Sequence, residues 1–193
     1  GGSLYKFCRH RLKHRKRPVG KRIRIHNRIS IHERPMEADG KRFGDFEMDT
    51  IIGNNNQGAL LTIVERTTNM LFMRKLKYGK EAKELAKEVI KMLKPYKGQI
   101  KSITTDNGSE FFAHQAIAKE LNTNVSFTNP YSSWQKGAVE NANGLIRQYI
   151  PKSSNIKQVS DKEIKDIMNK INTRPRKKLN FSTPEESFFN YLL

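Results

Sequence analysis

The chain has 193 residues, with 37 lysines and arginines against 19 aspartates and glutamates, so its formal net charge is +18 and its pI is about 10.1. This length fits about one domain, no apolar run approaches the roughly 20 residues of a membrane span, and the single cysteine, Cys8, excludes an intrachain disulfide framework and suits the reducing cytoplasm. Such an excess of positive charge favours a polyanionic partner, nucleic acid before any other.

The positive charge is concentrated near the start of the chain. Residues 1–43 hold 14 basic and 3 acidic residues, whereas the other 150 residues hold 23 and 16. We interpret residues 4–42 as a basic DNA-binding arm or linker that follows a phosphate backbone, with Arg15, Lys16 and Arg17 as candidate contacts. The alternative is a linker that only adds solubility.

The opening residues 1–3, Gly-Gly-Ser, look like the remnant of a cloning site. Cys8, His10 and His14 are potential zinc ligands, but without a second pair of thiols a zinc site is the weaker interpretation. Because residues 4–42 are interpreted as an arm, the folded catalytic domain is expected to span residues 43–193.

Residues 43–52, FGDFEMDTII, alternate as in a strand with one apolar face and one face in contact with water. The apolar face carries Phe46 and Met48, and the wet face carries Asp45, Glu47 and Asp49. A turn around Gly53 leads to two further strands, at 59–67 and 69–77, which we expect to be antiparallel.

The pattern becomes helical from Lys80, and Pro95 and Gly98 end this helix. Its apolar stripe consists of Ala82, Leu85, Ala86, Val89 and Leu93. Residues 99–105 then predict a strand, residues 109–121 a helix and residues 124–128 a short strand.

A long helix is expected from Ser132 to Tyr149. Its apolar face would hold Ala138, Ala142, Leu145 and Tyr149. At about 100° per residue, the opposite face would hold Lys136, Glu140, Asn143, Gly144 and Arg147. A single acid among lysine, asparagine and arginine is an unusual placement on a face otherwise suited to phosphate.

Two capping patterns begin the last helices: Ser160 with Glu163, and Thr183 with Glu186. The first of these helices would bury Ile164, Ile167, Met168 and Ile171. The order of elements predicts an α/β fold, with a mixed five-stranded sheet flanked by helices on both faces.

Three carboxylates are candidates for chemistry. Asp49 and Asp106 are expected near the carboxyl ends of neighbouring strands, where open α/β sheets bind ligands, and Glu140 would reach the same place from a helix. A site made only of carboxylate oxygens suits Mg²⁺ or Mn²⁺ rather than zinc. Two such ions about 4 Å apart can catalyse phosphoryl transfer, and the basic surroundings would hold the DNA that reacts.

Each acid also has an ordinary explanation. The Asp-Asn-Gly sequence at 106–108 is common in turns and helix caps, Asp49 shares its face with two other acids, and Glu140 could pair with Lys136. Only the three acids together, combined with the net charge, favour a metal site.

Four segments resemble the DDE transposases of bacterial insertion sequences, most closely the insertion-sequence family numbered thirty: FGDFEMDTIIG, TTDNGSEF, NPYSSWQKGAVENANGLIRQYIPK and NTRPRKKLNFSTPEESF. The resemblance runs from about Leu4 to the C-terminus, and 33 residues lie between Asp106 and Glu140, as in that family's DD(33)E pattern. It implies an RNase H-like fold of the retroviral-integrase superfamily, and it assigns Asp49, Asp106 and Glu140 as the catalytic and metal-binding acids.

The resemblance implies a transposase catalytic domain that uses Mg²⁺, with Mn²⁺ as a substitute and two ions in the site. Such an enzyme hydrolyses DNA at the ends of its element to free a 3′-OH and transfers that 3′-OH into target DNA. The implied partners are the terminal inverted repeats, the target DNA and a second copy of the chain, with which it forms a dimer. The implied location is the cytoplasm, at the nucleoid, and no membrane is involved. Such transposases carry N-terminal helix-turn-helix modules, and nothing in this sequence reads as one.

Other polar and aromatic positions are secondary candidates. Lys136, Asn143 and Arg147 could contact DNA or form a solvated helix face. Trp134 and Tyr131 could stack on a base at the cut or pack in the core.

Two more residues have a functional and a structural explanation. Glu110 could support the site or favour the start of a helix. Gly137 costs about 1 kcal/mol relative to alanine in a helix, and close approach of DNA or of a neighbouring strand would explain it.

Two other functions remain open. A related integrase or nuclease of the same fold would be distinguished by a 3′-OH strand-transfer assay. A non-catalytic DNA-binding protein derived from a transposase would normally have lost one of the acids, whereas all three are present here.

Overall fold

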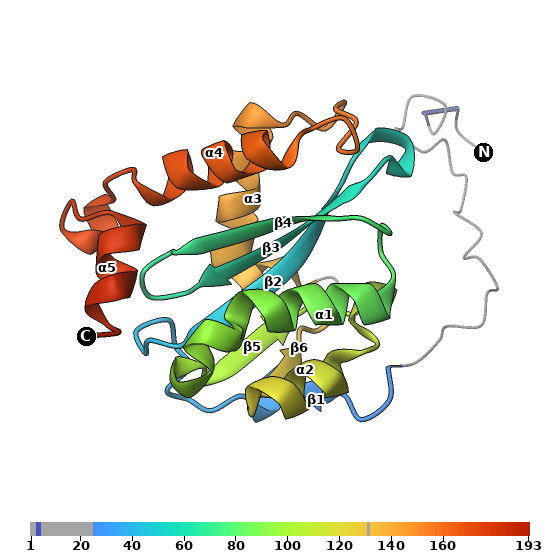
Figure 1. The fold of residues 1–193 in the computed structure, drawn as a ribbon. Coiled ribbons are helices and arrows are strands. Elements are labelled where there is room, and N and C mark those ends of the chain that lie inside the picture. Colours follow the sequence, from blue (N-terminus) through green and yellow to red (C-terminus); the bar gives the residue numbers. More distant parts are fainter. Residues whose placement is uncertain (1–2, 5–24, 131) are drawn as a thin grey trace.

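The computed structural model describes residues 3–4, 25–130 and 132–193 (Figure 1). In this part of the chain, six strands form one sheet with the order β1-β6-β5-β2-β3-β4. The strands are β1 (Ile29–Ser30), β2 (Asp45–Ile52), β3 (Ala59–Glu65), β4 (Leu71–Leu76), β5 (Ser102–Thr105) and β6 (Asn124–Phe127). The α-helices are α1 (Ala82–Leu93), α2 (His114–Leu121), α3 (Gly137–Tyr149), α4 (Asp161–Asn172) and α5 (Pro184–Asn190).

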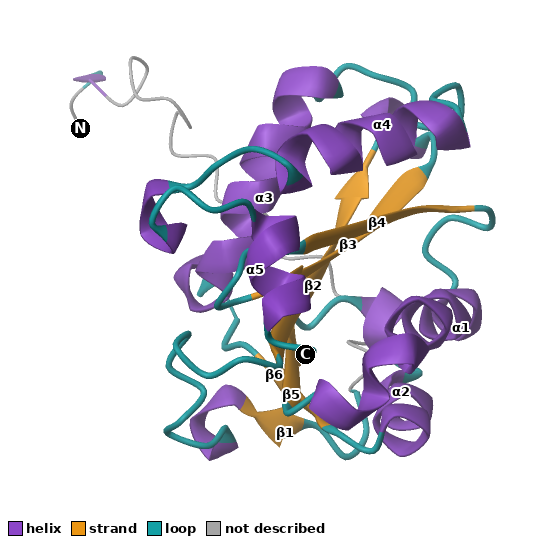
Figure 2. Ribbon diagram, turned by 60° about the vertical axis from the view of Figure 1, so that its left-hand side comes forward, coloured by secondary structure: helices purple, strands orange, loops and turns teal. Residues whose placement is uncertain are grey.

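The sheet is mixed, and helices cover both of its faces. β2, β3 and β4 are antiparallel, whereas β5, β6 and β1 extend the sheet from β2 by parallel pairing. Helices α1 and α2 lie on one face and α3 and α4 on the other (Figure 2). The predicted fold class is therefore confirmed. The sheet has six strands rather than five, because Ile29–Ser30, inside the predicted arm, pairs with β6.

The alternation of strand residues divides the core in two. On β3, Leu61 and Ile63 pack with α1, whereas Leu60 and Val64 pack with α3 and α4. All residues of β3 are buried, as expected for a central strand covered on both sides.

The prediction that one face of β2 is in contact with water is wrong. Asp45 and Glu47 are 0% and 1% exposed, because helix α3 and the segment before β2 cover that face. Each buried carboxylate has a cation of its own: Arg42 Nη2 lies 2.8 Å from Asp45 Oδ1, and Arg66 Nε lies 2.9 Å from Glu47 Oε1. Burial of a charge is tolerated when the charge is paired in this way.

The helices with strong local signals form as predicted. α1 buries Leu85, Ala86, Val89 and Leu93 of its expected stripe, whereas Ala82 is only partly buried. Both capping boxes are present, at Ser160 with Glu163 and at Thr183 with Glu186. The helix predicted at 109–121 is divided into a short 3₁₀ helix, Ser109–Phe111, and α2.

The predicted long helix is also divided, into a 3₁₀ helix, Ser133–Lys136, and α3. Lys136 has non-helical backbone angles of φ −123° and ψ 45°, so a helical projection does not give its orientation. The fully buried residues of α3 are Val139, Ala142 and Ile146, rather than Ala138 and Leu145, which are only partly buried. Tyr149, expected on the apolar face, is 45% exposed.

No helix of the described residues is both long and apolar enough to cross a lipid bilayer.

Replacement of Phe188 should test how firmly α5 is attached. Phe188 is 0% exposed and contacts Phe43, Phe72 and Tyr96, so Phe188→Ala should lower the free energy of unfolding by about 3–5 kcal/mol. The matched control is Phe189→Ala, because Phe189 is 44% exposed and should cost about 1 kcal/mol or less. Urea denaturation measures both, and equal losses would contradict the packing of α5.

Candidate active site

The two aspartates meet at the centre of the sheet. The parallel register of β2 and β5 pairs Glu47 with Thr104, and continued by two residues it places Asp49 opposite Asp106. Asp106 directly follows β5, whereas Asp49 lies within β2, three residues before Ile52. The predicted position at the carboxyl end of a strand therefore holds for Asp106, whereas Asp49 lies inside β2.

Lys136 connects the two aspartates. Its Nζ lies 3.3 Å from Asp49 Oδ1 and 3.0 Å from Asp106 Oδ2, and the residue is only 3% exposed. Lys136 was expected on an open helix face, and this placement is wrong because the helix does not extend through it. Its ammonium is instead the internal counter-ion of the aspartate pair.

Burial of Asp49 disfavours the negative charge of its carboxylate, and neighbouring polar groups partly offset this effect. Burial raises the pKa of the Asp49 carboxyl, the charge of Lys136 counteracts this rise, and the charge of Asp106 adds to it. The Thr50 amide also donates to Asp49 Oδ1 at 2.8 Å, and Asn143 Nδ2 donates to Oδ2 at 3.1 Å. The ionised pair therefore needs positive charge between its oxygens.

Glu140 lines the same cleft as the aspartates, from the first turn of α3, and it is exposed. The cleft has a volume of about 370 Å³. Among the described residues, no group of three or more acidic, histidine or cysteine side chains is close enough together to hold a metal ion as it stands. The structure thus brings Asp49 and Asp106 together at Lys136 and places Glu140 in the lining of the same cleft.

Glu110 belongs to the site rather than only to a helix start. It is 4% exposed, and its Oε1 accepts from Thr50 Oγ1 and Lys80 Nζ, each at 2.7 Å. Gly108 separates it from Asp106: a Cβ there would lie 2.5 Å from Glu110 Oε2 and 3.0 Å from Asp106 Oδ1. Glycine at this point of the Asp-Asn-Gly sequence therefore allows two carboxylates to lie on either side of one backbone position.

Asn107 fixes the loop that carries Asp106. Its Nδ2 donates to the Thr128 carbonyl oxygen at 2.7 Å, and its Oδ1 accepts from Arg28. The loop after β5 is thereby tied to the end of β6 and to the residues before β1.

Glu47 holds the start of α3. Its Oε2 accepts from the Val139 amide at 3.0 Å while Oε1 pairs with Arg66. Because Val139 directly precedes Glu140, this buried carboxylate positions the helical turn that carries the third acid. The sequence signal was the alternation that puts Glu47 on the face of Asp49, but its function could not be read without the partner helix.

The residues predicted to contact DNA differ in their hydrogen-bond partners and in their exposure. Arg147 donates to the carbonyl oxygens of Ile52, Ile150 and Pro151, and Asn143 is bound to Asp49, so both have structural partners. Trp134 is 74% exposed and is therefore not a core residue. The candidates at 15–17, the Cys8, His10 and His14 alternative, and Tyr131 lie outside the described residues.

The donor set fits a divalent cation. Asp49 and Asp106 offer carboxylate oxygens, which Mg²⁺ and Mn²⁺ prefer, and they already bind one positive charge between them. One polar atom is also unsatisfied: Asn143 Oδ1 is buried beside Asp49 and finds no partner among the described residues.

Comparison with known proteins agrees with this geometry. A family model described as integrase core domain matches residues 37–133, so the chain belongs to the integrase core domain family. The predicted resemblance to insertion-sequence transposases is confirmed as well. The chain is 47% identical to the transposase for insertion sequence element IS4351 of Bacteroides fragilis, over 97% of this chain and 59% of that protein.

The transposase InsI for insertion sequence element IS30C of Escherichia coli is 33% identical, over 92% of this chain and 46% of that protein. The chain thus spans about half the length of the curated relatives it matches. The catalytic core domain of BIV integrase has a similar fold, with a TM-score of 0.60 at 18% identity over 77% of this chain and 95% of that one.

Removal of the Lys136 charge should increase metal affinity. In Lys136→Met the aspartate pair loses its counter-ion, so Mn²⁺ should bind more tightly by about tenfold, the equivalent of ~1.4 kcal/mol. Calorimetric titration without DNA measures this. Lys80→Met is the control, because Lys80 lines the same cleft but pairs with Glu110. Equal affinities of Lys136→Met and wild type would contradict competition between the ammonium and the ion.

Loss of Glu47 should loosen the start of α3. Glu47→Ala leaves Arg66 buried without its carboxylate and should lower the free energy of unfolding by about 3–5 kcal/mol. Glu47→Gln keeps an acceptor for the Val139 amide and should preserve more of that amide's protection from hydrogen exchange. Glu163→Ala, which removes an exposed cap on α4, should cost about 1 kcal/mol and leave Val139 protected. Unchanged Val139 exchange in Glu47→Ala would exclude the anchoring role.

Proposed function

We propose that this domain is the catalytic part of a DDE transposase, which cuts DNA at the ends of its element and joins the resulting 3′-OH to target DNA. The observation that supports it most is the aspartate pair on adjacent strands, with a cation bound to both side chains and Glu140 lining the same cleft. The membership in the integrase core domain family and the transposase relatives support the same reaction class.

We assign Asp49, Asp106 and Glu140 as the residues that would hold divalent metal, Mg²⁺ with Mn²⁺ as a substitute, in a site for two ions. Bound there, such ions would supply activation of the attacking oxygen and stabilisation of the leaving oxygen in phosphoryl transfer. The exposed side chain of Glu140 is free to turn toward the aspartates without unfolding any element, because no hydrogen bond from the described residues holds it.

The remaining residues of the cleft have supporting roles. Asn143 and the Thr50 amide orient the Asp49 carboxylate. Lys136 neutralises the aspartate pair in the free protein, and when its ammonium leaves the pair it can contact a phosphate oxygen of the bound DNA. Glu110, held by Thr50 and Lys80, keeps a second carboxylate next to Asp106.

We infer that the DNA partners are the element's terminal repeats and the target, and that two copies of the chain act together. Joining two element ends to one target requires two active sites in one assembly, which supports a dimer as the smallest unit. The formal charge of +18 supports binding of the phosphate backbone.

A strand-transfer reaction tests the proposal. A pre-cleaved oligonucleotide with the element's end sequence is incubated with supercoiled plasmid and Mg²⁺ or Mn²⁺. Wild type should give joined product, whereas Asp106→Asn and Glu140→Gln should reduce both hydrolysis and joining to background while most DNA binding remains.

The outcomes separate the competing functions. Hydrolysis without joining would indicate a nuclease. DNA binding without either reaction, in the complete protein with both metals, would indicate a binding protein that has lost catalysis. Metal-dependent cleavage retained by a double variant of Asp106 and Glu140 would overturn the assignment of the site.

A further inference from the structure

A second groove lies beside the catalytic cleft. It has a volume of about 610 Å³. Its lining includes Trp134, Gly137 and Asn141 from the segment around the start of α3, and Arg176, Lys177 and Lys178. The three basic residues belong to the connection between α4 and α5, which includes the short 3₁₀ helix Lys177–Leu179.

The groove and the catalytic cleft share one ridge, residues 132–141. Ser132, Lys136 and Glu140 line the cleft, whereas Trp134, Gly137 and Asn141 line the groove. At the crest, a Cβ on Gly137 would meet no atom within 4 Å, so no neighbouring strand requires glycine there. A polymer bound at Glu140 can therefore cross into the groove over a low backbone.

The groove carries uncompensated positive charge. Of its acids, Glu47 is paired with Arg66, and Asp39 is exposed and lies 3.7 Å from Lys41. Arg176 Nε is buried and has no acceptor among the described residues, which costs about 1–3 kcal/mol for a donor left unsatisfied. Lys177 is exposed next to it, Lys178 is exposed and donates one bond to the Arg66 carbonyl oxygen at 2.9 Å, and Arg176 Nη2 donates to the Ile171 oxygen at 3.1 Å. These two bonds go to neutral carbonyl oxygens, so the positive charge of the groove is not neutralised and the groove is suited to an anion.

The cations nearest to the catalytic acids are already bound to protein groups. Lys136 pairs with Asp49 and Asp106, Lys80 pairs with Glu110, and Arg147 binds backbone oxygens. In the groove, by contrast, none of the three basic side chains is paired with a carboxylate among the described residues, and the Lys177 side chain is exposed.

The loop with the lysines has a fixed, strained shape. Asn180 and Phe181 both have left-handed backbone angles, φ 52° and φ 66°, and Phe181 is nevertheless 73% exposed. A bulky residue in this conformation costs on the order of 1–3 kcal/mol, and such outliers cluster at functional sites. Backbone bonds from Leu179 and Phe181 to the Arg176 oxygen, each 2.9 Å long, hold the loop in place.

We propose that this groove binds the DNA backbone adjacent to the reacting phosphodiester. Arg176, Lys177 and Lys178 contact phosphates, the strand crosses the ridge at Gly137, and Trp134 stacks on a base. The inference rests on the proposed function, since it presumes that the cleft acts on DNA. Charge selects a nucleic-acid strand over a second copy of the chain, because the chain itself carries +18.

Trp134 provides a direct probe, because it is the single tryptophan of the chain. A short DNA duplex of arbitrary sequence is titrated into the protein in EDTA, while anisotropy of the labelled DNA reports total binding. Tryptophan emission and its quenching by acrylamide report occupancy of the groove. Emission should fall and acrylamide quenching should decrease at the same DNA concentrations at which anisotropy rises.

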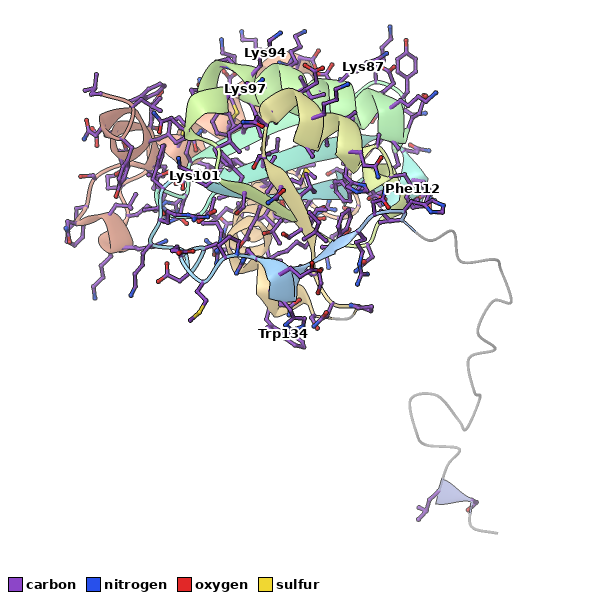
Figure 3. The ribbon with its side chains drawn as sticks, turned by 90° about the horizontal axis from the view of Figure 1, so that it is seen from below. Lys87, Lys94, Lys97, Lys101, Phe112 and Trp134 are labelled. Carbon is purple, nitrogen blue, oxygen red and sulfur yellow. The ribbon has the colours of Figure 1, made fainter. Side chains whose placement is uncertain are left out.

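A pair of double variants separates contact from loss of charge. Lys177→Gln with Lys178→Gln should weaken binding and reduce the slope of log K against log salt by roughly 1 for each lost phosphate contact. The control, Lys94→Gln with Lys97→Gln, removes the same charge from another 3₁₀ helix, Lys94–Gln99, far from Trp134 (Figure 3). The control should leave the slope unchanged.

Three results would overturn the proposal. DNA binding with unchanged acrylamide quenching of Trp134 would place the DNA elsewhere, and so would equal salt slopes for the two double variants. A change of emission with protein concentration alone would identify the groove as an interface between copies. Absence of DNA binding by wild type would instead count against the proposed function itself.

Discussion

The arrangement of this domain depends on charge compensation along one face of β2. Asp45, Glu47 and Asp49 alternate along the strand; the first two are buried and Asp49 is partly buried, so an isolated carboxylate at these positions would be costly. Each is matched by a cation from a different place in the chain: Arg42, Arg66 and Lys136. The first two pairs hold the fold together. The third pair lies at the cleft.

The Glu47–Arg66 pair also sets the position of helix α3. Glu47 binds both Arg66 and the start of α3, so β2 positions Asp49 directly and Glu140 through the helix. One strand therefore determines the placement of two of the three acids. The third, Asp106, follows β5, which is fixed to β2 by parallel pairing.

The sequence predicted what depends on neighbours along the chain. The caps at Ser160 and Thr183 and the stripe of α1 are local patterns, and the structure contains all of them. Two residues at 29–30 are too short to be recognised as a strand without β6. Asp45 and Glu47 seemed solvated because their cations cannot be matched to them from the sequence.

The orientation of Lys136 could not be predicted for a similar reason. A helical projection through 132–149 assumes one continuous helix, and the break at Lys136 reverses the environment of its side chain from solvent to interior. The pattern also could not choose Asp49 over its two neighbours. The family resemblance made that choice, and the structure shows a physical difference, since only Asp49 lines the cleft.

The ammonium of Lys136 between the aspartates has a consequence for how the domain folds. Many small metalloproteins fold only when the ion arrives, because the binding site does not exist before the chain folds. Here Lys136 supplies a positive charge between Asp49 and Asp106, so these two carboxylates can lie side by side without an ion. The domain can therefore reach its folded state with its own counter-ion in place, before any other cation enters the cleft.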